Sequence, residues 1–333
     1  MSSGIKRSQL EIADYTGGVL KNDKTILGRT ITLIESSSPN HYEKGRQVLK
    51  KLLPHAGESL RIGITGMPGA GKSTFIESLG CFLIEAGHKV AVLTVDPSSS
   101  LTKGSILGDK TRMAKLSRRD ECFIRPSPTG GTLGGVTRKT RETVLVCEAA
   151  GYDVLLIETV GVGQNEITVR SMVDFFLLLM IAGAGDELQA IKKGVIEIAD
   201  ALLINKADGA NKAAALSAAA EYSRALKYLI PATKGWQTEA YTCSALEGRG
   251  IPEIWAVIEK FEQTTKESGM FAARRNKQAV EWVFTIIEDH LKESFYNDAR
   301  VKEALPGIEE QILKNEILPT AAAEKLLRVF DSP

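Results

Sequence analysis

The sequence predicts an α/β fold with a mainly parallel sheet, flanked by helical extensions at both ends of the chain. Two observations support this prediction. Between about residues 60 and 260, short and unbroken apolar runs alternate with helical segments, as in strands that are buried on both faces. Outside this region, apolar residues recur at helical spacing only. We therefore predict an N-terminal helical extension at 1–57, a central domain at 58–264 and a C-terminal helical arm at 265–333.

The N-terminal extension is predicted to contain two helices between residues 24 and 53. Ser38, Pro39 and Asn40 separate them, and Pro54 ends the second. Apolar residues recur at helical spacing in both segments: Leu27, Ile31 and Ile34, then Val48, Leu49 and Leu52.

The central region contains seven apolar runs that are each predicted to form a strand. In chain order they are RIGIT, KVAVLTV, CFIRP, DVLLIE, DFFLLLMIA, ADALLIN and EAYTCSA. Because helical segments separate the runs, right-handed crossovers should align the carboxyl ends of the strands along one edge of the sheet. Ligands of such sheets bind at that edge.

The C-terminal arm is predicted to be helical. An apolar stripe marks its first long helix: Val280, Val283, Ile286, Ile287 and Leu291. Further helices are predicted at about 299–315 and 320–330. Since the arm carries too little apolar surface to fold alone, we expect it to pack on the central domain or on a second copy of the chain.

The composition is that of an ordinary globular chain, with 43% hydrophobic and 25% charged residues. With a formal net charge of +1, no global field favours nucleic acid or acidic lipid, and we expect neither as a partner. The N-terminus shows no signal-peptide pattern, and the longest apolar run, Phe175–Ala184, is about half the length that spans a bilayer. We therefore expect no membrane insertion and a cytoplasmic protein, or the mature part of an organellar one.

The cysteines are scattered along the chain without a CxxC pair, at Cys81, Cys122, Cys147 and Cys243. None of the four histidines lies in a metal-type cluster. We therefore predict reduced thiols rather than disulfides or a zinc site.

A phosphate-binding loop is predicted between the first strand and the helix that follows it. The segment GMPGAGKS, residues 66–73, matches the pattern G-x-x-x-x-G-K-[ST] in the required strand-to-helix context. Glycines let successive N–H groups curve around a phosphate, and the helix N-terminus adds positive potential. Lys72 is placed to reach the β- and γ-phosphates, and the Ser73 hydroxyl to bind Mg²⁺. A simple glycine-rich turn is the alternative, but it does not require the Lys-Ser pair.

Two further segments predict that the base is guanine. The strand LLI runs into Asn205, Lys206, Ala207 and Asp208, the pattern N-K-x-D. A carboxylate at Asp208 accepts from N1–H and the 2-amino group of guanine, whereas adenine offers neither donor. The segment Thr242–Leu246, TCSAL, follows another strand and resembles the S-A-x box, in which the alanine N–H donates to guanine O6. An N-K-x-D segment alone is weak evidence, because polar turns after strands are common. GTP is favoured over ATP because this segment follows a phosphate loop along the chain.

Acids at two further strand ends are candidates for the magnesium site. Asp96 follows VLTV, and Glu158 follows VLLI. Both should point to the ligand edge, where Mg²⁺ takes few protein ligands and keeps waters; two exposed acids are the alternative. Gly161 can donate its N–H to the γ-phosphate. Regulatory G proteins often place Gln after this glycine, whereas here Gln164 comes later, so we predict slow intrinsic hydrolysis that a partner accelerates.

Three polar, glycine-bounded loops are candidates for nucleotide-sensing segments. They span residues 104–112, 130–135 and 186–194. Lys192 or Arg112 is a candidate to place positive charge on the γ-phosphate, as an arginine finger does. Solvated loop charges are an equally natural interpretation of both residues.

Long segments of the chain resemble one family. They are VDPSSS, GSILGDKTRM, IRPSPTGGTLGG, CEAAGYDVLLIETVGVGQNE, AGAGDELQAIKKG and NKADG. The chain is similar to the MeaB/MMAA-type G proteins, also labelled ArgK, of the SIMIBI class of P-loop NTPases. The resemblance covers most of the chain, including LGRTITLIESSSPNH before the central domain.

The resemblance implies a GTPase that serves as a chaperone of an adenosylcobalamin-dependent acyl-CoA mutase, chiefly methylmalonyl-CoA mutase. Such proteins gate cofactor delivery from a cobalamin adenosyltransferase, protect the mutase, and are typically homodimers joined through C-terminal helices. The resemblance assigns GTP, GDP and Mg²⁺ as ligands. It implies three sets of site residues. The nucleotide set is Gly66, Pro68, Gly69, Ala70, Gly71, Lys72, Ser73, Thr74, Gly161, Asn205, Lys206, Asp208, Ser244, Ala245 and Leu246. The metal set is Ser73, Asp96, Asp109 and Glu158, and the catalytic set is Lys72, Asp109, Glu158, Gln164 and Lys192.

Three alternatives remain at this stage. Some of the family has been described as a kinase of a transport system for basic amino acids such as arginine and ornithine, but the sequence shows no second substrate pocket. A nucleotide-state adaptor without useful hydrolysis is the second. Nickel chaperones of the same branch often carry histidine-rich stretches, which this chain lacks.

Overall fold

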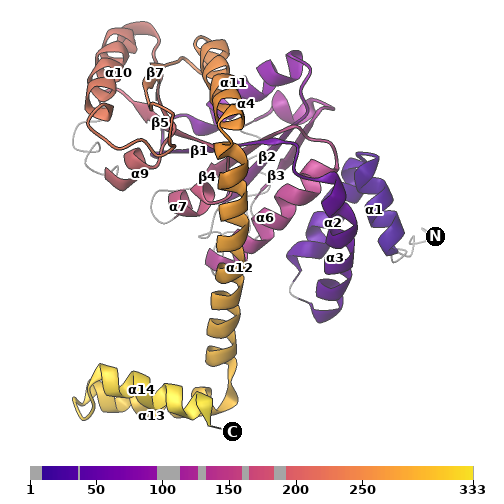
Figure 1. Ribbon diagram of the computed structural model, residues 1–333, viewed down its shortest axis with the longest axis vertical. Coiled ribbons are helices and arrows are strands. Elements are labelled where there is room, and N and C mark those ends of the chain that lie inside the picture. The colour runs from indigo at the N-terminus through magenta and orange to yellow at the C-terminus, as the bar shows by residue number, and fades with distance from the viewer. Residues whose placement is uncertain are drawn as a thin grey trace, which may run out of the picture. The chain divides into compact units, whose positions relative to one another are not determined.

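The computed structural model describes residues 10–36, 38–95, 113–126, 133–159, 165–183 and 193–332. All seven predicted strands form, and they make one sheet in the order β3-β2-β4-β1-β5-β6-β7 (Figure 1). Each pairing in this sheet is parallel. The strands are β1 Leu60–Gly66, β2 Val90–Val95, β3 Cys122–Arg125, β4 Val154–Thr159, β5 Phe175–Ile181, β6 Ala201–Asn205 and β7 Ala240–Thr242. The predicted α/β class is confirmed, and the fold is that of a P-loop NTPase.

Helices cover both faces of the sheet. On one face, α4 Lys72–Glu85 and α11 Ile251–Glu267 pack against one set of strand side chains. On the other face lie α6 Leu133–Ala149, α7 Asn165–Arg170 and α10 Lys212–Leu226. The short helix α9 Lys193–Glu197 precedes β6. Because successive strand residues point to opposite faces, the continuous apolar runs build two separate cores.

The N-terminal segment packs on the second face through three helices. The two predicted helices are α2 Lys24–Glu35 and α3 Pro39–Leu52, and the structure adds α1 Ile12–Leu20. A Cβ atom on Gly18 would lie 2.5 Å from Ile26 Cγ2, so this glycine permits a close contact between α1 and α2. The sequence pattern did not predict α1, because Gly17 and Gly18 are poor helix formers and only tertiary packing compensates for them.

Two units divide the chain by their internal contacts, residues 1–278 and 279–333. Helix α12, Met270–Asn297, begins in the first unit and ends in the second. The second unit also contains α13 Ala299–Leu313 and α14 Pro319–Asp331, close to the predicted bounds. These two helices pack on each other through a small core of Val301, Ile308 and Ala322.

The apolar stripe predicted on the C-terminal arm lies exposed on α12. Val280, Val283 and Leu291 have 58%, 54% and 58% of their surface exposed. Phe284 and Ile287 lie on the same side of the helix, since the spacing is i, i+3, i+4, i+7 and i+11, and both are exposed as well.

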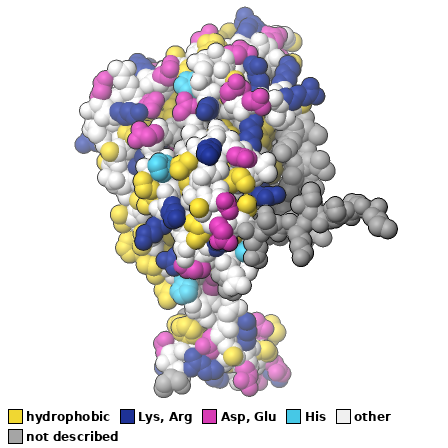
Figure 2. All heavy atoms as spheres, turned by 90° about the vertical axis from the view of Figure 1, so that its right-hand side faces the viewer, with side chains coloured by type: hydrophobic (Ala, Val, Ile, Leu, Met, Phe, Trp, Pro, Cys, Tyr) yellow, Lys and Arg dark blue, Asp and Glu magenta, His cyan; other side chains and the backbone are white. Residues whose placement is uncertain are grey.

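Basic and acidic side chains alternate over the face of the molecule shown in Figure 2. This mixture agrees with the formal net charge of +1. Within the described residues, no helix is long and apolar enough to cross a bilayer. The described cysteine thiols are free, and Cys122, Cys147 and Cys243 are buried.

Candidate nucleotide-binding site

The predicted phosphate loop lies between β1 and α4, at the carboxyl edge of the sheet. Gly66 has a φ of 152°, and a Cβ atom there would lie 2.3 Å from the Leu179 carbonyl oxygen of the neighbouring strand. Gly71 has a φ of 88°, and its Cβ would lie 2.6 Å from the Asn205 side-chain nitrogen. Both positions therefore require glycine, for backbone conformation and for space.

The first turn of α4 presents N–H groups and a lysine to this loop. The N–H of Phe75 donates to the Gly71 carbonyl, so the N–H groups of Lys72, Ser73 and Thr74 come before the first hydrogen bond within the helix. The Lys72 ammonium donates to the Gly66 carbonyl at 2.7 Å. Burial lowers the pKa of Lys72, and the carboxylates of Glu158 and Glu166 oppose this shift. The turn can therefore bind a phosphate through N–H groups and one cation.

Glu158 lies at the end of β4, between β1 and β2, and is only 6% exposed. Its register partners are Ile64 on β1 and Thr94 on β2. The carboxylate therefore enters the site beside the phosphate loop, close enough to Lys72 to influence its pKa. With the hydroxyl of Ser73, it supplies the oxygen donors that Mg²⁺ prefers.

Asn205, at the end of β6, joins the phosphate loop to the segment that follows β7. Its side-chain nitrogen donates to the Ala70 carbonyl at 2.8 Å. Its side-chain oxygen accepts from the Ala245 N–H at 3.1 Å and from the Cys243 thiol at 3.3 Å. Asn205 is 2% exposed, so it acts as a buried connector between two ligand-binding segments.

The base-recognition residues follow β6 and β7, which are neighbouring strands. The Ser244 hydroxyl donates to the Asp208 carboxylate at 2.6 Å, so one oxygen of this carboxylate is oriented by a neutral partner. Lys206 is exposed and has a φ of 59°, a left-handed conformation that is unusual for a residue with a side chain. Ala245 is buried, whereas Leu246 is 81% exposed.

Some predicted residues lie outside the described residues. They are Asp96, Asp109, Gly161, Gln164 and Lys192, with Arg112, the loop candidate at 104–112, and residues 130–132 and 186–192 of the loop candidates at 130–135 and 186–194. The described part of the predicted site is brought together at one edge of the sheet. Its glycine cradle, the N–H groups of the first turn of α4, the Asp208 carboxylate and the oxygen atoms of Ser73 and Glu158 are the groups that a guanine nucleotide with Mg²⁺ would need.

The structure adds residues that the sequence patterns did not indicate. The Ser78 hydroxyl donates to the Ala245 carbonyl and holds the S-A-x segment against α4. The hydroxyls of Thr65 and Thr159 lie 2.8 Å apart and join the ends of β1 and β4. Glu166, in the first turn of α7, is 3% exposed. Ser78 lies in none of the quoted segments, and Thr159 and Glu166 lie in one that carries the family resemblance but gives them no role, so only their spatial neighbours reveal them.

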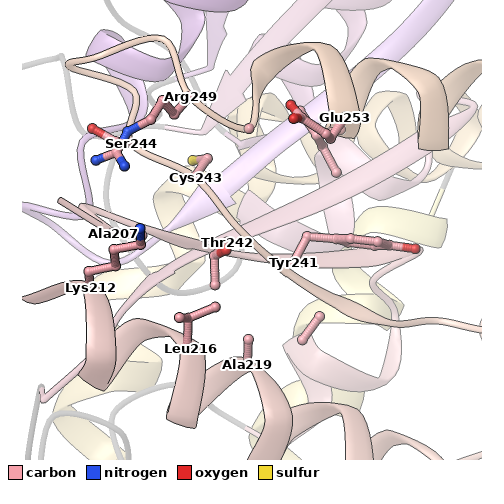
Figure 3. A pocket seen from close by; sticks show the side chains of 13 residues that line it. Ala207, Lys212, Leu216, Ala219, Tyr241, Thr242, Cys243, Ser244, Arg249 and Glu253 are labelled. Atoms are coloured by element: carbon pink, nitrogen blue, oxygen red, sulfur yellow. The ribbon is translucent and has the colours of Figure 1, made fainter.

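Two cavities flank the segment between β7 and α11. One, of about 440 Å³, lies between α10, β7 and the start of α11, and Lys212, Leu216, Tyr241 and Glu253 are among the residues that line it (Figure 3). The other, of about 400 Å³, lies between α4 and the loop at 245–248. The segment 243–248 therefore contributes residues to the lining of both cavities, and hydrogen bonds connect it to Asn205, Asp208 and Ser78.

Comparison with a known family covers most of the chain. Residues 27–300 match the family described as methylmalonyl Co-A mutase-associated GTPase MeaB. A protein named "Probable GTPase" from Mycobacterium tuberculosis is 50% identical over 92% of this chain and 91% of its own length. "GTPase ArgK" of Escherichia coli is 49% identical over 83% of each chain.

Two further relatives extend the similarity. The mouse protein named "Methylmalonic aciduria type A homolog, mitochondrial" is 44% identical over 99% of this chain and 82% of its own. A crystal structure titled "LAO/AO transport system kinase" is 37% identical, with a TM-score of 0.78 over 99% of this chain and 100% of that one.

Proposed function

The chain belongs to the MeaB family of methylmalonyl-CoA mutase-associated GTPases, and from this premise we propose what it does. It hydrolyses GTP to GDP and phosphate in the presence of Mg²⁺. It uses this cycle to gate the delivery of adenosylcobalamin to methylmalonyl-CoA mutase, or a related acyl-CoA mutase, and to protect that enzyme. A cobalamin adenosyltransferase is the proposed source of the cofactor.

The observation that carries the nucleotide assignment is the hydrogen-bond set of Asn205. One amide side chain holds the phosphate loop through Ala70 and the S-A-x segment through Ala245. Ser244 meanwhile orients the Asp208 carboxylate. A site that contacts phosphates at one end and a guanine edge at the other needs such a rigid connection.

The proposed chemistry follows from the groups beside the phosphate loop. The N–H groups of Lys72, Ser73 and Thr74 hold phosphate oxygens, and the Lys72 ammonium stabilises the charge that develops during transfer. Ser73 and Glu158 would hold Mg²⁺, with Asp96 and Asp109 as further proposed ligands. The bound ion neutralises phosphate charge and fixes the geometry of transfer.

Hydrolysis by the protein alone is proposed to be slow. We propose that Glu158 holds the attacking water, while Val162 occupies the sequence position where a regulatory G protein often has glutamine. Gln164 and Lys192 remain proposed catalytic residues that a bound partner would bring into position.

The decisive experiment combines binding with kinetics. The purified chain is mixed with candidate cobalamin-dependent acyl-CoA mutases, complexes are isolated, and GTP hydrolysis is measured with and without each mutase. The proposal expects one mutase to co-purify and to accelerate hydrolysis. If no mutase binds the chain or accelerates its GTP hydrolysis, the chaperone assignment is rejected. The GTPase assignment is tested separately, by whether the chain hydrolyses GTP at all.

A transport-system kinase is the second candidate, because a structure of 37% identity carries that title. The two functions differ in where the γ-phosphate goes. With γ-labelled GTP, the GTPase releases the label as inorganic phosphate. Label that is retained on a side chain of an acceptor protein would instead support the kinase.

The exposed stripe on α12 supports a homodimer. Val280, Val283 and Leu291 expose more than half of their surface along one side of the helix, and a second copy offers the same stripe. Light scattering of the full chain should give twice the monomer mass, and a Val283→Glu, Leu291→Glu double variant should give the monomer mass. A wild-type monomer at micromolar concentration would reject the dimer.

A further inference from the structure

A cluster of buried charges lies at the amino edge of the sheet, opposite the nucleotide site. Asp174 directly precedes β5 and Asp200 directly precedes β6, with 1% and 0% of their surfaces exposed. The Asp174 carboxylate accepts from the Arg61 N–H at 2.9 Å, and that of Asp200 accepts from the Phe176 N–H at 2.9 Å. Two buried carboxylates so close to strand starts need cationic partners.

The first turns of α12 supply two of these cations. Arg275 binds the Asp174 carboxylate, at 2.8 and 2.6 Å, and the carbonyls of Gly57 and Ser59. Arg274 donates to the Asp174 carbonyl and to the Thr233 hydroxyl, and its guanidinium lies 3.6 Å from the Asp200 carboxylate. The beginning of α12 is therefore fixed by charge to β5 and β6.

The same part of α12 also binds the end of α7. The Gln278 side chain, 7% exposed, donates to the Val173 carbonyl at 2.8 Å and to the Arg170 carbonyl at 3.4 Å. Arg170 is the last residue of α7, and its guanidinium donates to Asp200 at 3.3 Å. Asp200 is thus shared between one arginine of α7 and one of α12.

The other end of α7 faces the nucleotide site. Glu166 lies in its first turn, is 3% exposed, and is close enough to Lys72 to influence that ammonium electrostatically. Glu166 and Arg170 are four residues apart, so they lie on the same side of this short helix. Consistent with this placement, α7 packs against β4 and β1, the strands that carry Glu158 and the phosphate loop.

The contact between α7 and the cluster is incompletely satisfied. Arg170 Nη1 is buried and lies 3.1 Å from the Asp200 carboxylate, yet makes no hydrogen bond of acceptable geometry. The charges are paired, but the geometry is not that of a full hydrogen bond, so this contact is weaker than the two-pronged pair of Arg275 with Asp174.

We propose that α7 couples the nucleotide site to the start of α12, through Glu166 at one end and the Arg170–Asp200–Arg274 and Gln278 contacts at the other. A change of bound nucleotide shifts α7, and the shift changes how firmly the first turns of α12 are held. This coupling rests on the proposed GTPase function and names its route of regulation. Helix α12 is the element through which the rest of the C-terminal arm is connected to the central domain.

The test measures amide hydrogen exchange of the full-length chain across residues 270–297, with Mg²⁺ and either GDP or a non-hydrolysable GTP analogue. The wild type should show protection that differs between the two states by about 5-fold or more, the lower end of usual allosteric coupling. Gln278→Met and Arg274→Lys should remove the difference. By reciprocity, both should also change the ratio of GDP affinity to analogue affinity by about the same factor.

The matched control is Arg275→Lys, which changes the adjacent arginine but touches Asp174 and two carbonyls rather than α7 or Asp200. It should keep the nucleotide-dependent difference. The proposal is overturned if the wild type shows no difference or if Gln278→Met and Arg274→Lys both retain it. Loss of the difference in all three variants would also overturn it, because the cluster would then act only as structural support.

No mutase is present in this experiment, so its outcome is independent of the chaperone assignment. Coupling without stimulation by any mutase would leave the inference intact and reject the proposed client. Stimulation by a mutase without coupling through α7 would support the proposed client and reject the inference.

Discussion

At the carboxyl edge of the sheet, charged side chains are held by neutral groups, whereas at the amino edge they are held by one another. Lys72 donates to a carbonyl and Asp208 accepts from a hydroxyl. Asp174, by contrast, binds Arg275 in a two-pronged ion pair. A charged side chain that is hydrogen-bonded only to neutral groups retains a net charge that can attract a ligand. In an ion pair, the opposite charge cancels most of the electrostatic potential. The same residue types thus bind at one edge and support the fold at the other.

The largest effect is expected from breaking the amino-edge cluster. Asp174→Ala leaves Arg275 buried without its carboxylate, and removing one partner of a buried pair costs about 3–5 kcal/mol. Urea unfolding of the nucleotide-free chain should show this loss. If the contrast between the edges holds, the folded variant still binds GDP with near wild-type affinity. A strong loss of GDP affinity at unchanged stability would contradict it.

Glu158→Ala tests the opposite edge. On the proposed role of this carboxylate at the metal and the attacking water, GTP hydrolysis should fall by about 10²–10³-fold, as for other groups that stabilise a transition state. GTP binding should change far less, and the unfolding midpoint should not fall. Single-turnover kinetics with equilibrium binding separates the two quantities. Equal losses in binding and hydrolysis would assign Glu158 to binding alone.

Asp208→Asn sharpens the comparison for a single ligand contact. The variant replaces an acceptor with a donor opposite guanine N1–H, so the preference for GDP over ADP should fall by about 10–100-fold, the cost of one or two unmatched polar groups. Xanthosine diphosphate, which has a carbonyl at C2, should gain affinity. Competition binding with the three nucleotides gives these ratios. Unchanged selectivity would show that the base site is misassigned.

The smallest effect concerns Glu142 on α6. Burial raises the pKa of Glu142 to about 7, against the opposing charges of Arg138 and Lys139. A raised carboxyl pKa favours the folded state below about pH 4.5, and this contribution is lost as the pH rises through about 7. Glu142→Gln should therefore gain stability over the wild type at pH 8, by about 1–2 kcal/mol, and show no gain at pH 4. A gain of equal size at both pH values would exclude titration as its cause.

Most of the fold could be predicted from the sequence, because its signals are local. The central strands are largely apolar runs, and the phosphate loop and N-K-x-D are each contained within eight consecutive residues. The N-K-x-D motif places Asn205 at the end of a strand on the ligand edge, and its hydrogen bond to the phosphate loop agrees with that position. The bounds of α13 and α14 were equally close, because apolar spacing alone defines them.

What could not be predicted depends on contacts between distant residues. Arg275 and Asp174 are about a hundred positions apart, and an arginine in a helical pattern is normally a solvated charge. Ser78 lies outside the motifs and Cys243 has no role in the S-A-x pattern beside it, yet their side chains donate to the Ala245 carbonyl and the Asn205 side chain. Helix α1 depends on the close approach that Gly18 allows, which no propensity scale contains.

Because Asn205 binds both the phosphate loop and the segment with Ala245, the proposed site would not recognise the two halves of a nucleotide independently. A ligand that orders the loop around Ala70 also tightens the position of Ala245, through one shared amide. GDP should then bind more favourably than the summed binding free energies of guanosine and pyrophosphate. The difference should be larger than the entropic gain from joining two ligands into one molecule. Guanosine alone would be discriminated poorly from other nucleosides, so base selectivity in this fold is conditional on the presence of phosphate.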